Sequence, residues 1–278
     1  FCGITGIKPT SGRVPRTGHV IPFGLGAVDS LTQIGPMARY VEDLILILPL
    51  IAGVDWYDPA IVPVPLGNPS AVDLKSLRVA VHTDNGIRTP TQETITAVNA
   101  AAAALSEVAL SVEEELPAAL KQSPELSNKF WGADGLAGLR RLLEKAGTTE
   151  VHPWLKRWLD TASPMAIAEF TALLEDMDQF RSEMLTFMQH YDAILCPVFV
   201  SPAQPHGATL AREMAPAFSY TSAYNLTGWP GVVVRAGTSP EGLPIGVQVV
   251  ARPWREDIAL AVAQQIETAL GGWQRPSL

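Results

Sequence analysis

The sequence predicts an α/β fold in which helices cover both faces of a mixed β-sheet. A short β-branched run at residues 77–81 is followed by an alanine-rich helical segment to about residue 106 and by another apolar run at residues 108–116. This order is typical of a βαβ unit, whose two strands are parallel and whose helix covers the sheet. Two further strand patterns, at residues 232–234 and 245–250, are separated by a turn-rich segment.

The composition agrees with a well-cored globular protein. Of the 278 residues, 47% are hydrophobic and 17% are charged, which excludes a disordered chain. A chain of this length can bury one large core or two modest ones. The 20 Lys and Arg residues against 28 Asp and Glu give a net charge of −8, and the longest basic cluster is Arg140-Arg141. An acidic chain without a basic stripe is a poor candidate for binding nucleic acid or anionic lipid.

The first third of the chain begins with loops and continues into a helix. Residues 1–40 are rich in Gly, Pro and Thr, which favours loops that join short strands. Apolar residues then recur at helical spacing from Val41 to Ile51, and Gly53 suits the left-handed position just past a helix end. Pro49 removes one backbone donor inside this helix and predicts a bend. The Pro-rich residues 55–73 are expected to form a surface connection.

Helix starts are predicted where Thr or Ser precedes Pro. In residues 89–92, Thr can cap the helix, Pro90 can take the first helical position and Gln92 can close a capping box. Residues 117–162 are expected to be helical, with Gly132, Gly135 and Gly138 loosening the helical pattern. Ser163-Pro164 then predicts the start of one long helix that continues to His190. A strand at residues 193–196 and a closing helix at residues 256–270 complete the pattern.

The longest apolar stretch and the cysteine content limit the setting of the protein. Residues 44–54 are too few for a membrane helix, which needs roughly 20 apolar residues, and Pro49 interrupts them. We therefore expect no membrane span. Cys2 and Cys196 allow at most one disulfide, and a chain of this size has no need of one. A reducing, cytoplasmic location follows as an expectation.

The residues taken alone give no complete set of catalytic groups. The five histidines have no paired spacing that would place two on one helix face, so no metal site is predicted. The chain has no Gly-x-Ser-x-Gly motif. Cys2 and Cys196 lie among apolar, Gly and Pro residues without a positive partner nearby, which favours buried, inert thiols. We expect neither a metal nor an organic cofactor.

Three separated blocks resemble the amidase signature family of serine hydrolases. The first is FCGITGIKPTSGRVPRTG at residues 1–18, continued by SLTQIGPMARYVEDLILILPLIAGVDWYD at residues 30–58. The second is YDAILCPVF at residues 191–199, and the third is SYTSAYNLTGWPGVVVRAG, followed by EGLPIGVQVVARPWRED, at residues 219–257. The resemblance extends over nearly the whole chain, and residues 117–162 contribute least to it.

The resemblance implies hydrolysis of carboxylic amides by a Ser-Ser-Lys triad. In this family a Gly-Gly-Ser segment, whose serine is the nucleophile, directly precedes the FCG motif, and the second serine and the lysine lie further upstream. Residues 1–278 would then be the C-terminal portion of an amidase domain, and the N-terminal catalytic portion and all triad residues would precede Phe1. We assign no catalytic residue within the chain, which we expect to supply the sheet and one wall of the substrate pocket and to be inactive alone.

The resemblance also places the candidate substrate-binding residues. Relatives that act on glutamine, such as the glutamine-hydrolysing component of glutamyl-tRNA amidotransferase, carry an acidic residue at about the position of Phe218. Residues 218–222 contain no carboxylate and are closer to the SYT-x-x-YN pattern of fatty acid amide hydrolases, which lines an apolar acyl channel. We therefore predict that Phe218, Thr221, Ser222 and Trp131 bind a small, uncharged, partly apolar amide.

Two other functions stay open at this point. The chain can belong to the component of a glutamyl-tRNA amidotransferase that passes ammonia to a partner protein, or it can be a non-catalytic binding module that kept the sheet of the family. A homodimer is also left open.

Overall fold

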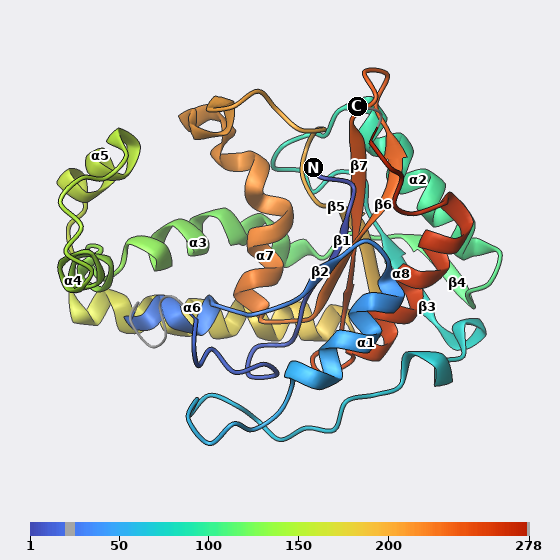
Figure 1. The fold of residues 1–278 in the computed structure, drawn as a ribbon, viewed down its shortest axis with the longest axis horizontal. Helices are drawn as coiled ribbons and strands as arrows, with labels where there is room; N and C mark the ends of the chain where they lie inside the picture. The colour runs from blue at the N-terminus through green and yellow to red at the C-terminus, as the bar shows by residue number, and fades with distance from the viewer. Residues whose placement is uncertain (20–25, 277–278) are drawn as a thin grey trace.

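The computed structural model describes residues 1–19 and 26–276, and these residues fold around a mixed sheet with the strand order β2-β1-β6-β7-β5-β3-β4 (Figure 1). The strands are β1 (Thr5–Lys8), β2 (Met37–Ala38), β3 (Arg78–Val81), β4 (Ser111–Glu114), β5 (Ala193–Pro197), β6 (Gly231–Thr238) and β7 (Pro244–Ala251). Strand β3 is parallel to β4 and β5, whereas the pairs β5–β7, β6–β7, β1–β6 and β1–β2 are antiparallel. The α/β fold class with a mixed sheet is confirmed.

One face of the sheet is covered by α1 (Val41–Ile51), α2 (Gln92–Ser106) and α8 (Glu256–Leu270). Helix α2 connects the parallel strands β3 and β4, so the predicted βαβ unit is confirmed. Val79 and Val81 of β3 point into this layer, whereas Ala80 belongs to the core on the opposite face. This alternation is the two-residue period of a strand that is buried on both sides.

The other face is covered by α3 (Ser123–Gly132), α6 (Ile167–Phe187) and α7 (Ser219–Thr227). Their buried side chains pack against Ala80, Ile194 and Cys196 of the sheet. Helices α4 (Ala137–Lys145) and α5 (Pro153–Thr161) lie beyond this layer, at the end of the molecule away from the sheet (Figure 1). Short 3₁₀ helices complete the fold: η1 (Gly26–Leu31), η2 (Pro69–Ala71), η3 (Leu74–Ser76), η4 (Ala118–Gln122), η5 (Ala208–Leu210) and η6 (Arg212–Phe218).

Two predicted helix starts are wrong by a few residues. Helix α2 begins at Gln92 with Thr91 as its N-cap residue, so Pro90 precedes the helix and does not occupy its first position. Helix α6 begins at Ile167, after the predicted start at Ser163-Pro164. Pro164 instead forms an antiparallel bridge with Asp134, which holds this segment extended. The helix can start only after that bridge, where the Ala166 amide donates a hydrogen bond to the Glu169 carboxylate at 3.1 Å.

The end of α1 agrees with the sequence. The helix ends at Ile51, and Gly53 has a φ of +111°, in the region that glycine enters at little cost. Pro49 lies inside this helix; the bend expected there stays a prediction. Within residues 1–19 and 26–276, no helix is long and apolar enough to cross a membrane.

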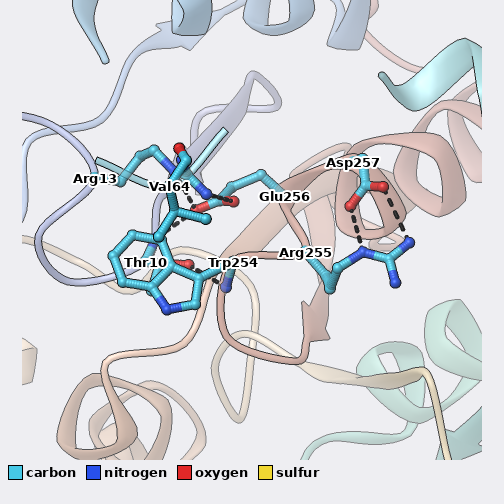
Figure 2. A network of polar contacts seen from close by, with 7 residues as sticks. All are labelled: Thr10, Arg13, Val64, Trp254, Arg255, Glu256 and Asp257. Atoms are coloured by element: carbon cyan, nitrogen blue, oxygen red, sulfur yellow. Dashed lines mark hydrogen bonds and ion pairs between the residues drawn. The ribbon is translucent and has the colours of Figure 1, made fainter. Parts of the chain in front are cut away.

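A buried ion pair fastens the turn after β1 to the start of α8 (Figure 2). Arg13 donates from Nε to Glu256 Oε1 at 3.2 Å and from Nη2 to Glu256 Oε2 at 3.0 Å, and the Thr10 amide donates to Oε1 at 3.0 Å. The guanidinium carbon of Arg13 lies 4.8 Å from the ring centroid of Trp254. These contacts fix the path of the chain that leaves β1.

Candidate functional site

An apolar pocket of about 210 Å³ contains two of the predicted substrate-binding residues. Phe218 is the last residue of η6 and the N-cap of α7, and Thr221 lies in the first turn of α7. The other walls come from Phe1, helix α2, the segment after β5 and the strands β6 and β7. The lining is Phe1, Thr94, Val198, Phe199, Ser201, Phe218, Thr221, Val233, Pro244, Ile245 and Gly246. It contains no charged side chain, so the pocket suits an apolar or neutral group.

Three aromatic rings line this pocket in succession. Phe199 contacts Phe1 on one side and Phe218 on the other, each edge to face with ring centroids 5.2 Å apart. The two outer rings are accessible, since Phe1 is 54% exposed and Phe218 is 43% exposed. Aromatic rings in this arrangement give a rigid apolar surface that a ligand can cover.

Helix α7 is held in place by a buried tyrosine. The Tyr220 hydroxyl donates to the Arg88 carbonyl at 3.0 Å and accepts from the Asn85 amide at 3.1 Å. The Gln248 side chain, on β7, donates to the Tyr220 carbonyl at 2.6 Å. The start of α7, which carries Thr221 and is capped by Phe218, is thereby held against the sheet and the loop after β3.

A second buried tyrosine on α7 contacts a histidine and a thiol. The Tyr224 hydroxyl lies 3.2 Å from His82 Nε2 and 3.8 Å from Cys196 Sγ. Burial lowers the pKa of His82 to about 4 and raises the pKa of Cys196 to about 12. The predicted burial of Cys196 is confirmed, and the raised pKa favours its protonated form; its inertness stays a prediction. Cys2 is exposed, so its expected burial is wrong.

The other two candidate residues lie apart from the apolar pocket. Ser222 lines a neighbouring pocket of about 120 Å³, which also contains Phe218. Trp131 is 38% exposed on α3 and lines neither of these pockets. The structure thus brings together Phe218 with Thr221, and Phe218 with Ser222, but not Trp131.

Another apolar pocket, of about 360 Å³, lies between η1, α3 and the start of α6. It is lined by Phe130, Met165 and Phe170 among others, and it contains the carboxylate of Asp134. Asp134 Oδ2 accepts the Gly138 amide at 2.9 Å, so this carboxylate caps the start of α4. None of the four predicted residues lines this pocket.

Sequence reasoning missed Phe1 and Phe199 as pocket residues. Both belong to the blocks that carry the family resemblance, but only the sheet brings residue 1 next to residue 199. In residues 1–19 and 26–276, no group of three or more His, Cys, Asp and Glu side chains is placed to hold a metal ion.

Comparison with known proteins gives the same family across the chain. The sequence profile of the family described as Amidase matches residues 1–260. The A subunit of glutamyl-tRNA(Gln) amidotransferase from Brevibacillus brevis is 32% identical over 304 residues, which cover 99% of this chain and 61% of the relative. The acylamidase of Rhodococcus erythropolis is 29% identical over 284 residues, which cover 96% of this chain and 57% of the relative. The chain therefore spans about three fifths of the length of these relatives.

Solved structures have the same fold. A 6-aminohexanoate cyclic dimer hydrolase, solved in complex with its substrate, superposes with a TM-score of 0.82 at 25% identity and covers 97% of this chain and 61% of its own. Fatty acid amide hydrolase superposes with a TM-score of 0.79 at 23% identity, over 96% of this chain and 53% of its own, a likeness that shows the fold alone. With a family profile that matches residues 1–260 and relatives that align over nearly its whole length, the chain belongs to the amidase signature family.

Proposed function

We propose that this chain forms the sheet and one wall of the substrate pocket in an enzyme that hydrolyses apolar carboxylic amides. The observation that carries the proposal is the uncharged aromatic pocket around Phe1, Phe199 and Phe218. Membership of the amidase signature family supports the reaction class, and the pocket supports the choice of substrate.

The chemistry of the reaction would be supplied by groups outside this chain. The resemblance implies that a neutral lysine takes a proton through one serine, and that the activated second serine attacks the amide carbonyl. The acyl-enzyme that forms is then cleaved by water. In the family the nucleophilic serine lies a handful of residues before the FCG motif, so the segment that begins at Phe1 would lie on the side of the pocket that faces the reacting carbonyl. The apolar pocket that Phe1 lines would then hold the group attached to that carbonyl.

The pocket disfavours substrates that carry an ammonium group. Burial of a charged group without an opposite charge or hydrogen-bond partners costs several kcal/mol, and the lining offers no carboxylate. Free glutamine carries an α-ammonium group, which would have no partner of opposite charge in this pocket. We therefore expect the intact protein to prefer aryl or alkyl amides to glutamine.

The test is a comparison of kcat/KM for an apolar aryl amide and for glutamine in the intact protein. We expect the aryl amide to be the better substrate. Phe218→Asp should lower kcat/KM for the aryl amide and raise it for amino-bearing amides, because a carboxylate pairs with an ammonium and is poorly compatible with an apolar chain. Phe218→Leu is the control, since it keeps the pocket apolar. Faster hydrolysis of glutamine by the unaltered protein would overturn the apolar-pocket assignment.

One observation favours a second candidate function. The amidotransferase relative from Brevibacillus brevis is 32% identical over 99% of this chain, so an ammonia-transferring component of such an enzyme is the alternative. That component would release ammonia from glutamine, which the kcat/KM comparison measures directly. We also expect residues 1–278 alone to release no ammonia from either substrate.

A further inference from the structure

The smaller pocket beside Phe218 differs in character from the apolar one. It lies between α3, η6 and α7 and is lined by Pro124, Ser127, Asn128, Ala215, Pro216, Phe218, Ser219 and Ser222. Phe218 is the one residue that the two linings share. Phe218 therefore borders both an apolar pocket and a pocket in which half of the lining residues have polar side chains.

The polar side chains of the smaller pocket have donors and acceptors that the described residues leave without a hydrogen-bond partner. In the part of the chain that the structure describes, Ser127, Asn128 and Ser222 make no side-chain hydrogen bond to another residue. Ser219 Oγ accepts from Asn85 Nδ2 at 2.8 Å, and its own hydrogen has no acceptor among the described residues. Two of these residues, Ser127 and Ser222, are half-buried, where a hydrogen bond to a ligand replaces fewer bonds to water.

The size and charge of this pocket restrict its ligand. Its volume is about 120 Å³, against about 210 Å³ for the apolar pocket, so it suits the smaller of two groups. The lining contains no charged residue, so neither a carboxylate nor an ammonium would find a partner of opposite charge. Hydroxyl and amide side chains both donate and accept hydrogen bonds, which suits a neutral polar group.

We propose that the smaller pocket is a second subsite that binds a neutral hydrogen-bonding group of the substrate, such as a hydroxyl or carboxamide, while an apolar group of the same substrate fills the pocket around Phe199. Phe218 is the wall between the two subsites. The proposal rests on the proposed function for the apolar pocket, and it narrows the substrate to amides that carry both an apolar part and a neutral polar part.

The test measures binding rather than hydrolysis. The intact protein is titrated with phenylalkanols of graded chain length and with phenylalkanes of the same length, by ligand-observed NMR. None of these probes contains an amide, so turnover does not disturb the measurement. At the chain length that spans Phe218, we expect the alkanol to bind about two- to tenfold more tightly than the matched alkane, the effect of one net hydrogen bond.

Variants test whether the tighter binding of the alkanol depends on the smaller pocket. In the double variant Ser222→Ala/Asn128→Ala the alkanol should lose its advantage, whereas the affinity for the alkane stays unchanged. Both replaced side chains lack hydrogen-bond partners within the described residues, so the fold should be unaffected. Ser182→Ala, on the exposed surface of α6, is the matched control and should keep the advantage.

The outcomes separate this inference from the proposed function. If alkanes bind, and Phe218→Asp weakens them, but no alkanol is tighter, the second subsite is refuted and the apolar pocket stands. An advantage that survives in the double variant also refutes the second subsite. If alkanes do not bind, or bind independently of Phe218, both the subsite and the proposed pocket are refuted.

Discussion

Replacement of Glu256 by Gln tests the buried ion pair that fastens the turn after β1 to α8. Glu256 is completely buried and Arg13 is 2% exposed. The two Glu256 oxygens accept three hydrogen bonds, two from Arg13 and one from the Thr10 amide. Gln keeps one acceptor oxygen but turns an NH₂ group toward a guanidinium that can only donate. The variant therefore loses one hydrogen bond and leaves the Arg13 charge without its counterion.

The expected cost is large because the charge that remains cannot reach water. Removal of one partner from a buried ion pair typically costs about 3–5 kcal/mol, and the Trp254 ring, 4.8 Å from the guanidinium carbon, compensates only a fraction of that. We expect the free energy of unfolding to fall within this range. Arg13→Met combined with Glu256→Gln should recover part of the loss, because the unpaired charge is gone.

The assay is urea unfolding of the intact protein at neutral pH, read as the midpoint at constant m-value. The matched control is Glu125→Gln, which breaks an exposed pair with Lys129 on one helix surface. Exposed pairs contribute little to stability, so its midpoint should stay close to that of the unaltered protein. Equal midpoints for the Glu256 and Glu125 variants would refute the reasoning about burial.

Three further predictions follow from burial and close packing. Burial lowers the pKa of His82 from 6.5 to about 4, so between these pH values the unfolded chain binds a proton that the folded chain excludes. The free energy of unfolding should therefore fall by up to about 1.4 kcal/mol per pH unit as the pH drops from 6.5 toward 4. His82→Gln should flatten this pH dependence in urea titrations. A thiol reagent should label the exposed Cys2 rapidly and Cys196 only on unfolding, because Cys196 is fully buried; equal rates in the folded protein would contradict this. Gly35→Ala should unfold at a much lower urea concentration, because its Cβ would overlap the backbone oxygen of Ile7 on β1. Gly132→Ala has open space around its Cβ on α3 and should be neutral or slightly stabilising. Similar unfolding midpoints for the two variants would refute the packing argument.

Local patterns were enough to predict the elements that are buried in regular layers. Helix α8 begins at Glu256 and ends at Leu270, as the sequence predicts. Its apolar spacing and the glycine at its C-cap are features of neighbouring residues, which a local pattern contains. The βαβ unit and the presence of strands β6 and β7 are predicted for the same reason, whereas the pairing of β6 with β7 comes from the structure. The start of α6 was not, because it depends on a bridge between Asp134 and Pro164, which lie far apart in sequence.

The candidate site was predicted only in part. The family resemblance pointed to Phe218 and Thr221, and both line the apolar pocket. No local pattern indicates that Phe1 and Phe199 lie in the same pocket, because their contact depends on the order of strands in the sheet. The Arg13–Glu256 pair joins residues 243 positions apart, so no local sequence pattern predicts it either.

The central claim is that the apolar part of the substrate lies against Phe199 and Phe218. The most direct measurement is photolabelling of the intact protein with an aryl amide that carries a diazirine on its ring, followed by mass spectrometry of the labelled peptides. We predict labels within residues 198–201 and 218–221, which an excess of unlabelled aryl amide removes. Competed labels at Phe130, Met165 or Phe170 instead would place the substrate in the other apolar pocket and contradict the claim.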